Sequence, residues 1–190
     1  MNADSFTDNG ELIPQLYFGR TRKERHQELV AHGVRGAIHQ ARTAYESANG
    51  NGRIHINVLW EMGGAEEVLH GALAGAKGLI HGVTCGAGMP YKIAQIAASY
   101  GVHYYPIISS ARAFRALWKR SYHKFEDWLG GVVYEDPWLA GGHNGLSNSE
   151  DPLKPEAPRA RVAELRKVMN AAGLNEVPII MAGGVWRLDE

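Results

Sequence analysis

The sequence predicts a parallel α/β fold, in which short strands alternate with helices. Two observations predict it. From residue 52 onward, short runs rich in β-branched residues alternate with stretches of helical periodicity, and glycines flank several of these segments. Strands joined through helices pair in parallel by right-handed crossovers, and they form either an open doubly wound sheet or a closed barrel. The spacing alone leaves both architectures open.

The individual elements follow from the same pattern. A strand is predicted over 54–60, because its aliphatic residues are mostly β-branched and glycines lie on both sides. A helix over 64–76 follows, since its apolar residues fall on one face. The alternation then predicts strands over 78–84, 103–108, 131–134 and 177–181. It also predicts three helices: one over 91–100, one that begins at a cap formed by Ser109 or Ser110, and one that contains Val162 to Ala172. Five strands of the βα type result.

The first 50 residues do not continue this pattern. Thr21 to Glu24 resemble a capping box that opens a helix, and the spacing of Val34, Ile38, Ala41 and Tyr45 suggests a second helix. We therefore expect an N-terminal helical segment or insertion over 1–50, followed by an α/β region over 51–190. A complete barrel takes about 250 residues, so five strands predict an incomplete barrel and a truncated sequence.

Composition excludes several classes of partner. Lys and Arg together number 20, as do Asp and Glu, so no excess of positive charge indicates nucleic acid or an anionic membrane. No stretch approaches the roughly 20 apolar residues that span a bilayer. Cys85 is the single cysteine, and no secretory leader opens the chain, so we expect a cytoplasmic protein. No His or Cys pair has zinc spacing, and we expect no metal.

Two glycine pairs follow predicted strands, at 141–142 and 183–184. Paired glycines let main-chain N–H groups approach a phosphate closely. A single pair is as often ordinary loop punctuation, but two pairs at strand ends favour a phosphorylated cofactor. In a parallel barrel, these carboxyl ends of the strands carry the chemistry.

His143 stands between glycines in the loop after the strand at 131–134. An imidazole with an unperturbed pKa of about 6.5 can serve as a general base near neutral pH. The alternative is a solvated loop histidine, which is the commoner role of a histidine chosen at random. Its place at a strand end makes His143 the candidate for catalysis.

Weaker candidates have ordinary explanations. Glu135 and Asp136 are adjacent, so at most one of them should face a site. Cys85 is more often a small buried residue than a nucleophile. The segment 86–90 starts like a dinucleotide fingerprint but lacks the third glycine. A solvated basic face is expected for Arg112, Arg115, Lys119 and Arg120.

Three motifs together resemble one enzyme family. The stretch Val132 to Gly145, read as VVYEDPWLAGGHNG, resembles the nitronate monooxygenases, formerly called 2-nitropropane dioxygenases, in which a strand leads to Ala-Gly-Gly-His. The stretch Val177 to Val185 is similar to the family's strand ending in Ala-Gly-Gly at the flavin phosphate. Ile56-Asn57-Val58 resembles a third motif, whose asparagine contacts the flavin. The likeness covers roughly residues 52–186.

The resemblance implies a TIM-type (β/α)₈ barrel, of which this chain supplies about five of the eight parallel strands. It also implies an FMN cofactor across the strand ends, bound by Asn57, Asp136, Gly141, Gly142, Gly183 and Gly184. Asp136 stands where the family usually has a glutamine, and its carboxylate would repel the reduced flavin unless it turns away. His143 would remove the proton α to a nitro group, and oxidation with O₂ would give a carbonyl compound and nitrite. The partners would be a nitronate or nitroalkane and O₂.

Two other interpretations stay open. One is an NAD(P)H-dependent flavin oxidoreductase of the enoyl-thioester reductase type, which shares the barrel and its phosphate site. The other is an inactive truncated fragment, because the family's opening Pro-Met strand and final Gly-Thr phosphate contacts are not visible in the sequence. The natural substrate and the oligomeric state do not follow from the sequence.

Overall fold

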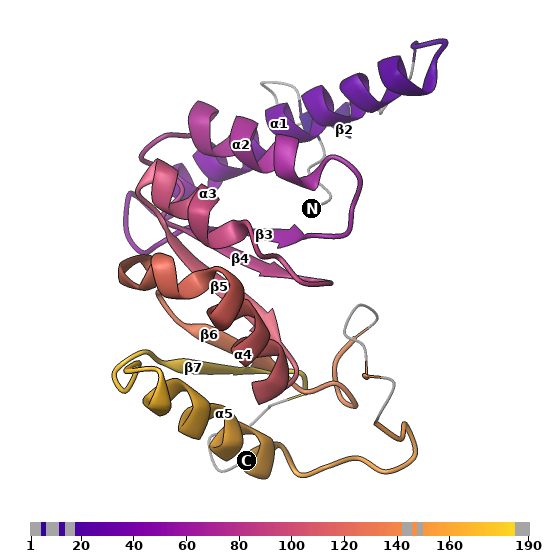
Figure 1. Cartoon of the computed structure of the whole chain (residues 1–190). Helices are drawn as coiled ribbons and strands as arrows, with labels where there is room; N and C mark the ends of the chain where they lie inside the picture. Colours follow the sequence, from indigo (N-terminus) through magenta and orange to yellow (C-terminus); the bar gives the residue numbers. More distant parts are fainter. Residues whose placement is uncertain (1–4, 7–11, 14–17, 142–145, 148–149, 185–190) are drawn as a thin grey trace. The chain divides into compact units, whose positions relative to one another are not determined.

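A computed structural model describes residues 5–6, 12–13, 18–141, 146–147 and 150–184 of the chain. The chain forms two compact units, Met1–Val83 and Thr84–Glu190, and the boundary falls within strand β4 (Gly82–Gly86). Figure 1 labels the α-helices and most of the strands of both units. No helix in the described part of the chain is long and apolar enough to cross a membrane.

The first unit contains a long helix. The described elements of this unit begin with a short antiparallel pair, β1 (Ser5–Phe6) and β2 (Leu12–Ile13). They continue with the long helix α1 (Arg22–Ser47), strand β3 (His55–Leu59) and helix α2 (Ala65–Gly75). The predicted capping box is confirmed: the Thr21 hydroxyl accepts from the Glu24 N–H, and the Glu24 carboxylate accepts from the Thr21 N–H at 2.8 Å. The prediction of two separate helices was wrong, because no proline or cap residue interrupts the helix before Ser47.

Helices α1 and α2 pack closely because α2 carries glycines where they meet. A Cβ atom added to Gly71 would lie 2.4 Å from a methyl of Val34, and one added to Gly75 would lie 2.2 Å from a methyl of Ile38. Any side chain at these two positions would separate the helices. The first unit therefore depends on small residues for its helix pair.

The second unit repeats strand and helix along the chain. After β4 come α3 (Ile93–Tyr100), β5 (His103–Ile108), α4 (Ala111–Arg120), the 3₁₀ helices η1 (Tyr122–Lys124) and η2 (Glu126–Trp128), β6 (Val132–Glu135), α5 (Pro158–Ala171) and β7 (Ile179–Ala182). Strands β5 and β6 pair in parallel, and so do β6 and β7, with Val133 opposite Ile180 and Glu135 opposite Ala182. Strand β5 with helix α4, and strand β6 with helix α5, thus form successive βα repeats.

The predicted strands are confirmed, and one of them is displaced. The strand expected over 78–84 lies at 82–86 instead, because residues 77–79 form a turn in which Gly78 adopts a left-handed φ of 83°. The caps agree with the sequence: the Ser110 hydroxyl accepts from the Ala113 N–H, and Gly101 ends α3 in the left-handed conformation. Local capping chemistry therefore sets the helix limits.

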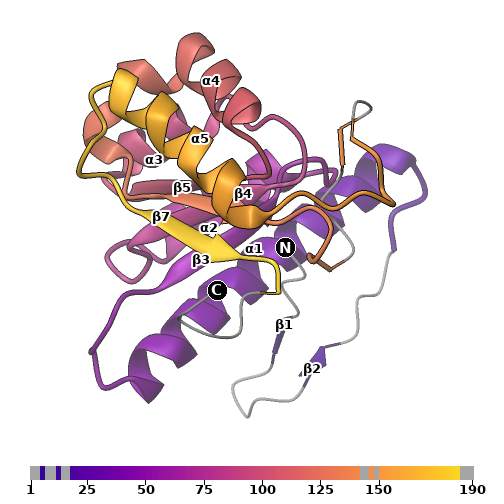
Figure 2. The same cartoon turned by 90° about the horizontal axis from the view of Figure 1, so that it is seen from below.

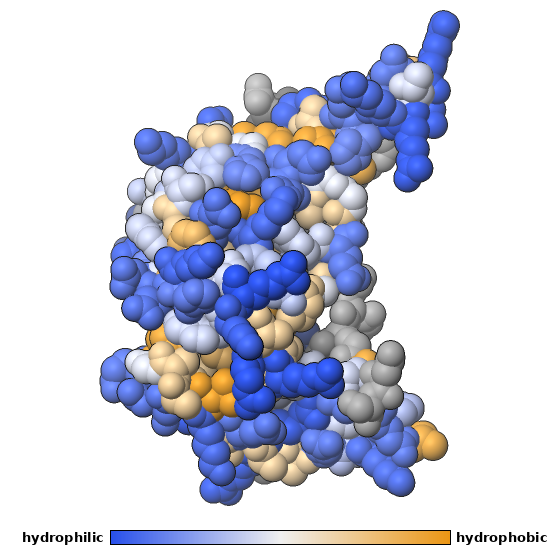
Figure 3. All heavy atoms as spheres, in the orientation of Figure 1, coloured by the Kyte–Doolittle hydropathy of each residue, from blue (hydrophilic) through white to orange (hydrophobic). Residues whose placement is uncertain are grey.

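Helices α4 and α5 lie side by side along one face of the strands of the second unit (Figure 2). Their inward residues Phe114, Leu117, Leu165 and Met169 are almost completely buried. Figure 3 shows mainly hydrophilic side chains over the outward surfaces of these helices. This arrangement of parallel strands with helices covering one face is that of a TIM-type barrel, and the strands do not close into a ring in the described part of the chain.

Candidate active site at the strand ends

The predicted site residues fall in both units. Asn57 is an exposed residue of β3 in the first unit. Gly141 lies in the loop after β6, where it is exposed and an added Cβ would meet nothing within 4 Å. Gly142 and the predicted base His143 lie outside the described residues. The geometry of the site therefore comes from the residues on either side of them.

Asp136, the first residue after β6, is buried, with an exposed fraction of 1%. One of its carboxylate oxygens accepts hydrogen bonds from the Trp138 N–H at 2.9 Å and the Leu139 N–H at 3.0 Å. The other oxygen accepts from the Tyr134 hydroxyl at 3.4 Å. Burial, and then the charge of Asp136, raise the pKa of Tyr134 to about 12, so this hydroxyl stays a donor. The carboxylate thus turns into its own loop.

Gly183 and Gly184 follow β7 and both adopt left-handed backbone angles, with φ of 82° and 77°. A Cβ on Gly183 would lie 2.7 Å from the backbone nitrogen of Asp136, which is too close for any side chain. The Asp136 N–H also donates to the Ala182 carbonyl at 3.1 Å. The glycine pair therefore lets the end of β7 pack directly against the backbone at the end of β6.

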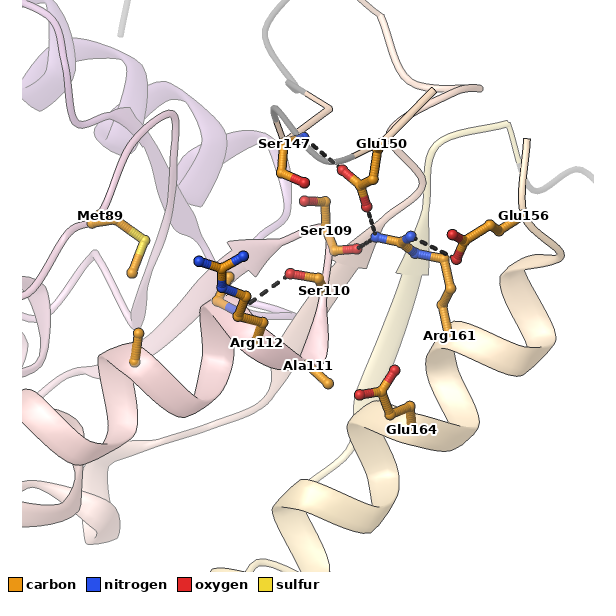
Figure 4. Close-up of a pocket in the computed structure, with 12 residues that line it drawn as sticks. Met89, Ser109, Ser110, Ala111, Arg112, Ser147, Glu150, Glu156, Arg161 and Glu164 are labelled. Atoms are coloured by element: carbon orange, nitrogen blue, oxygen red, sulfur yellow. Dashed lines mark hydrogen bonds and ion pairs between the residues drawn. The ribbon is translucent and has the colours of Figure 1, made fainter. Parts of the chain in front are cut away.

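A pocket of about 890 Å³ opens beside the carboxyl end of β5. Figure 4 shows Ser109 and Ser110 at the end of the strand, Arg112 from α4, and Arg161 and Glu164 from α5 around it. The remaining lining residues include Met89, Ala111, Ala113, Ala116, Ser147, Glu150 and Glu156. A pocket at this end of a parallel strand is where barrel enzymes commonly bind substrate.

Arg161 forms the wall of this pocket with a set of charged and polar contacts. Its guanidinium donates to Glu150 at 2.5 Å, to Glu156 at 2.9 Å and to the Ser109 carbonyl at 2.7 Å. The guanidinium also stands over the ring of Trp138, 5.1 Å from its centroid. The side chains of Arg161 and Glu150 are only 9% and 11% exposed. We call these five residues the Arg161 cluster.

The Arg161 cluster was not predicted from the sequence, although a signal was present. Arg161 is four residues before Leu165 and eight before Met169, and these three residues form the buried face of α5. An arginine at helical spacing within an apolar stripe indicates a buried, paired charge. The acidic partners Glu150 and Glu156 lie in the loop that was predicted as irregular, where no periodicity marks them.

Two of the weaker candidates, Cys85 and the basic side chains of α4, lie where the sequence predicts them. Cys85 is fully buried, and burial raises the pKa of its thiol to about 12, which suits a core residue and not a nucleophile. The basic side chains of α4 are exposed. Within the described ranges, no group of three or more His, Cys, Asp or Glu side chains is placed to hold a metal ion.

Comparison with known proteins identifies the fold. No protein-family model matches the chain, and no curated protein matches it. Among solved structures, a point mutant of FabK from Thermotoga maritima superposes with a TM-score of 0.54 at 17% identity, over 78% of this chain and 42% of the FabK chain. Unmutated FabK from Thermotoga maritima gives a TM-score of 0.52 at 16% identity, over 77% of this chain and 46% of its own.

This likeness shows that the chain has a TIM-type barrel fold. The chain spans less than half the length of the two FabK chains, at 42% and 46%. The open strand arrangement of the described residues agrees with this partial coverage, since a closed barrel needs eight strands. The predicted α/β fold class with an incomplete barrel is therefore confirmed.

Proposed function

We propose that this chain carries part of an FMN-dependent oxidoreductase, and that the reaction is the oxidation of alkyl nitronates and nitroalkanes by O₂ to a carbonyl compound and nitrite. The observation that carries the proposal is the Ala-Gly-Gly-His segment, 140–143, which follows strand β6 on a barrel fold. The carboxyl ends of parallel strands are where barrel enzymes place their reacting groups. The similarity to FabK supports the flavin-dependent class and leaves the substrate open.

The glycine pair after β7 supports the proposal of a flavin phosphate site. Gly183 and Gly184 offer main-chain N–H groups without side chains at the end of β7, and Gly184 is exposed. Main-chain N–H groups of glycines can approach an anion closely, because no side chain stands in the way. The Asp136 carboxylate is held by hydrogen bonds within its own loop, which would weaken its repulsion of a reduced flavin. FMN, when bound, would supply the electron transfer.

His143 would act on the proton of the substrate. A neutral nitroalkane must lose the proton on the carbon next to the nitro group, and a positioned imidazole can accept it near neutral pH. A nitronate has already lost this proton and does not need the base. The two forms of the substrate therefore separate the role of His143 from the rest of the reaction.

The test measures nitrite release in air from a nitroalkane and from its preformed nitronate, without NAD(P)H. His143→Ala should keep bound FMN, lose turnover of the neutral nitroalkane by on the order of 10²–10⁴-fold, and retain most turnover of the nitronate. His123→Ala, which changes an exposed histidine of the same unit, is the matched control. If His143→Ala turned over the neutral nitroalkane as fast as wild type does, His143 would have no role in the mechanism.

A second candidate is the NAD(P)H-dependent reduction of an enoyl thioester on the same kind of flavin barrel. The likeness to FabK supports it as much as the first, and a pocket of about 890 Å³ has room for a substrate larger than a small nitroalkane. Strict dependence of turnover on NAD(P)H would favour this candidate and exclude the first. A purified chain without flavin absorbance would contradict both and support the inactive fragment.

A further inference from the structure

Two adjacent carboxylates, Glu135 and Asp136, lie at the carboxyl end of β6. The sequence predicts that at most one of them faces a site, because successive residues of a strand point to opposite faces. Asp136 is buried and accepts hydrogen bonds from its own loop. By the same alternation, Glu135 belongs to the opposite face of the strand.

The face of β6 that carries Tyr134 is the face covered by helices. Val132 and Tyr134 are completely buried, whereas Val133 and Glu135 are only partly buried. Burial contributes most to the raised pKa of the Tyr134 hydroxyl, and the Arg161 guanidinium of α5 opposes this rise, so Tyr134 lies on the side of α5. Figure 2 shows α4 and α5 along this one face of the strands. Val133 and Glu135 therefore face away from the helices.

The face away from the helices is largely apolar. A Cβ added to Gly131 would lie 3.2 Å from the ring of Tyr105 and 3.4 Å from a methyl of Ile180, so these three residues share this face. Val133 pairs with Ile107 on one side and with Ile180 on the other. The three strands thus present a continuous layer of aliphatic side chains.

Glu135 lies next to this layer, at the carboxyl end of the face. Its partner on β7 is Ala182, whose side chain is too small to cover a neighbouring glutamate. Within β5, β6 and β7, all of whose residues are described, Glu135 is the only carboxylate. In a TIM-type barrel the helices lie outside, so this face is the barrel interior, and its carboxyl end is where barrel enzymes bind and convert their substrates.

A carboxylate beside an aliphatic layer selects ligands by charge. It attracts a cationic group and repels an anion, and both effects are stronger at a partly buried position than in water. The aliphatic layer binds the alkyl part of a ligand without regard to charge. A nitronate is an anion and a nitroalkane is neutral, so the two proposed substrates should not bind equally well.

We infer that Glu135 is a specificity-determining residue, and that the site selects substrates with an alkyl body and a neutral or cationic polar group over anionic ones. The inference rests on the proposed function for the identity of the substrate. The orientation of Glu135 rests on the register and burial of β6 alone. Of the two proposed substrates, the neutral nitroalkane is then the preferred one.

The first experiment tests the orientation of Glu135 without turnover. The carboxyl groups of the purified full chain are coupled to glycine ethyl ester with a water-soluble carbodiimide, and fragmentation mass spectrometry locates the label. Glu135 should be labelled several-fold faster than Asp136, because Glu135 is partly exposed and Asp136 is only 1% exposed. Protection of Glu135 equal to or greater than that of Asp136 would overturn the inference.

The second experiment measures KM with the flavin-loaded protein for a nitroalkane, its preformed nitronate and a nitroalkane with a terminal ammonium group. Glu135→Gln should lower KM for the nitronate roughly 10- to 100-fold, because a nearby like charge is removed. It should raise KM for the ammonium compound and leave KM for the neutral nitroalkane within a few-fold. Glu176→Gln, which changes an exposed glutamate before β7, is the matched control and should behave as wild type.

The outcomes separate a charge effect from a structural one. Glu135→Asp keeps the charge, so it should keep the wild-type order of preference, whereas a shift of all three KM values in the same direction in Glu135→Gln would contradict the inference. Turnover by wild type with no shift in Glu135→Gln would refute the specificity role and leave the proposed function standing. If wild type turned over none of the three compounds, the proposed function and the substrate preference would both fail, and the labelling would still decide the orientation of Glu135.

Discussion

Two strand ends of the second unit are held in opposite ways. At the end of β5, the side chain of Arg161 binds the Ser109 carbonyl and two carboxylates, so charged side chains make the contact. At the end of β7, Gly183 packs against the Asp136 backbone with no side chain at all. The first contact should respond to pH, because a carboxylate takes part in it, and the second should respond only to volume. The carboxyl ends of these strands thus combine a contact between charged side chains with a contact between backbone atoms.

The largest effect is expected from Arg161→Met. Removing one partner of a buried ion pair leaves the other charge without compensation, which costs roughly 3–5 kcal/mol. Glu150, 11% exposed, would be that stranded charge. Denaturant unfolding of the variant measures the loss. The double variant Arg161→Met with Glu150→Gln should recover part of it, and no recovery would show that the pair is not coupled.

A somewhat smaller loss is expected from Gly183→Ala. The left-handed φ of 82° and the contact at 2.7 Å with the Asp136 nitrogen both oppose a Cβ, and we expect a cost of roughly 2–4 kcal/mol. Gly184→Ala should cost slightly less, about 1–3 kcal/mol, because its Cβ would lie within 3.0 Å of one atom, the Cβ of Leu139, whereas a Cβ on Gly183 would meet three backbone atoms of Asp136 within 3.2 Å. Gly141→Ala is the control. Thermal unfolding that ranks the three variants otherwise would contradict a backbone contact at Gly183.

The pH dependence should differ between the two strand ends. Burial raises the pKa of Glu150, but hydrogen bonds from Ser147 and Arg161 outweigh it and hold the pKa below its ordinary value of 4.5. The stability that Glu150 contributes is therefore present above pH 4.5 and is lost as the pH falls through the lower pKa of the folded state. The stability difference between wild type and Glu150→Gln should shrink below pH 4.5 in acid titrations. The difference caused by Gly183→Ala should not.

The smallest effect is expected from Ser110→Ala, which removes the cap of α4 at the same end of β5. The Ser110 hydroxyl accepts a single hydrogen bond from the Ala113 N–H at 3.3 Å, and its loss should cost about 1 kcal/mol. Chemical denaturation measures this difference. A loss as large as that of Arg161→Met would show that any hydrogen bond at this strand end is as important as the charged cluster.

Local patterns predicted most of the fold. The strand at 103–108 coincides with β5, and the capping residues Thr21 and Ser110 begin the helices that they were expected to begin. These features depend on residues within one turn or one strand, so the sequence contains the whole cause. The single helix α1 was missed because periodicity detects apolar faces and does not detect the continuity of the backbone between them.

The candidate site was predictable only in part. The glycines and Asp136 were chosen as candidates because motifs name residue types at fixed spacing, and their role in a flavin site stays a prediction. Two further features could not be predicted. One is the close contact between Gly183 and the Asp136 backbone, which joins the ends of two strands that lie far apart in the sequence. The other is the set of hydrogen bonds that the Asp136 carboxylate accepts from its own loop. The Arg161 cluster joins positions up to 52 residues apart, Ser109 and Arg161, and no local pattern specifies such a contact.

The burial of Cys85 gives the second unit an internal reporter. It is the single cysteine of the chain, it has no exposed surface, and it lies in β4. A thiol reagent can therefore label the chain only after the structure that covers Cys85 has opened. At high reagent concentration the labelling rate equals the rate at which this structure opens. Labelling of Cys85 therefore measures that rate in every variant of the two strand ends, without an engineered probe.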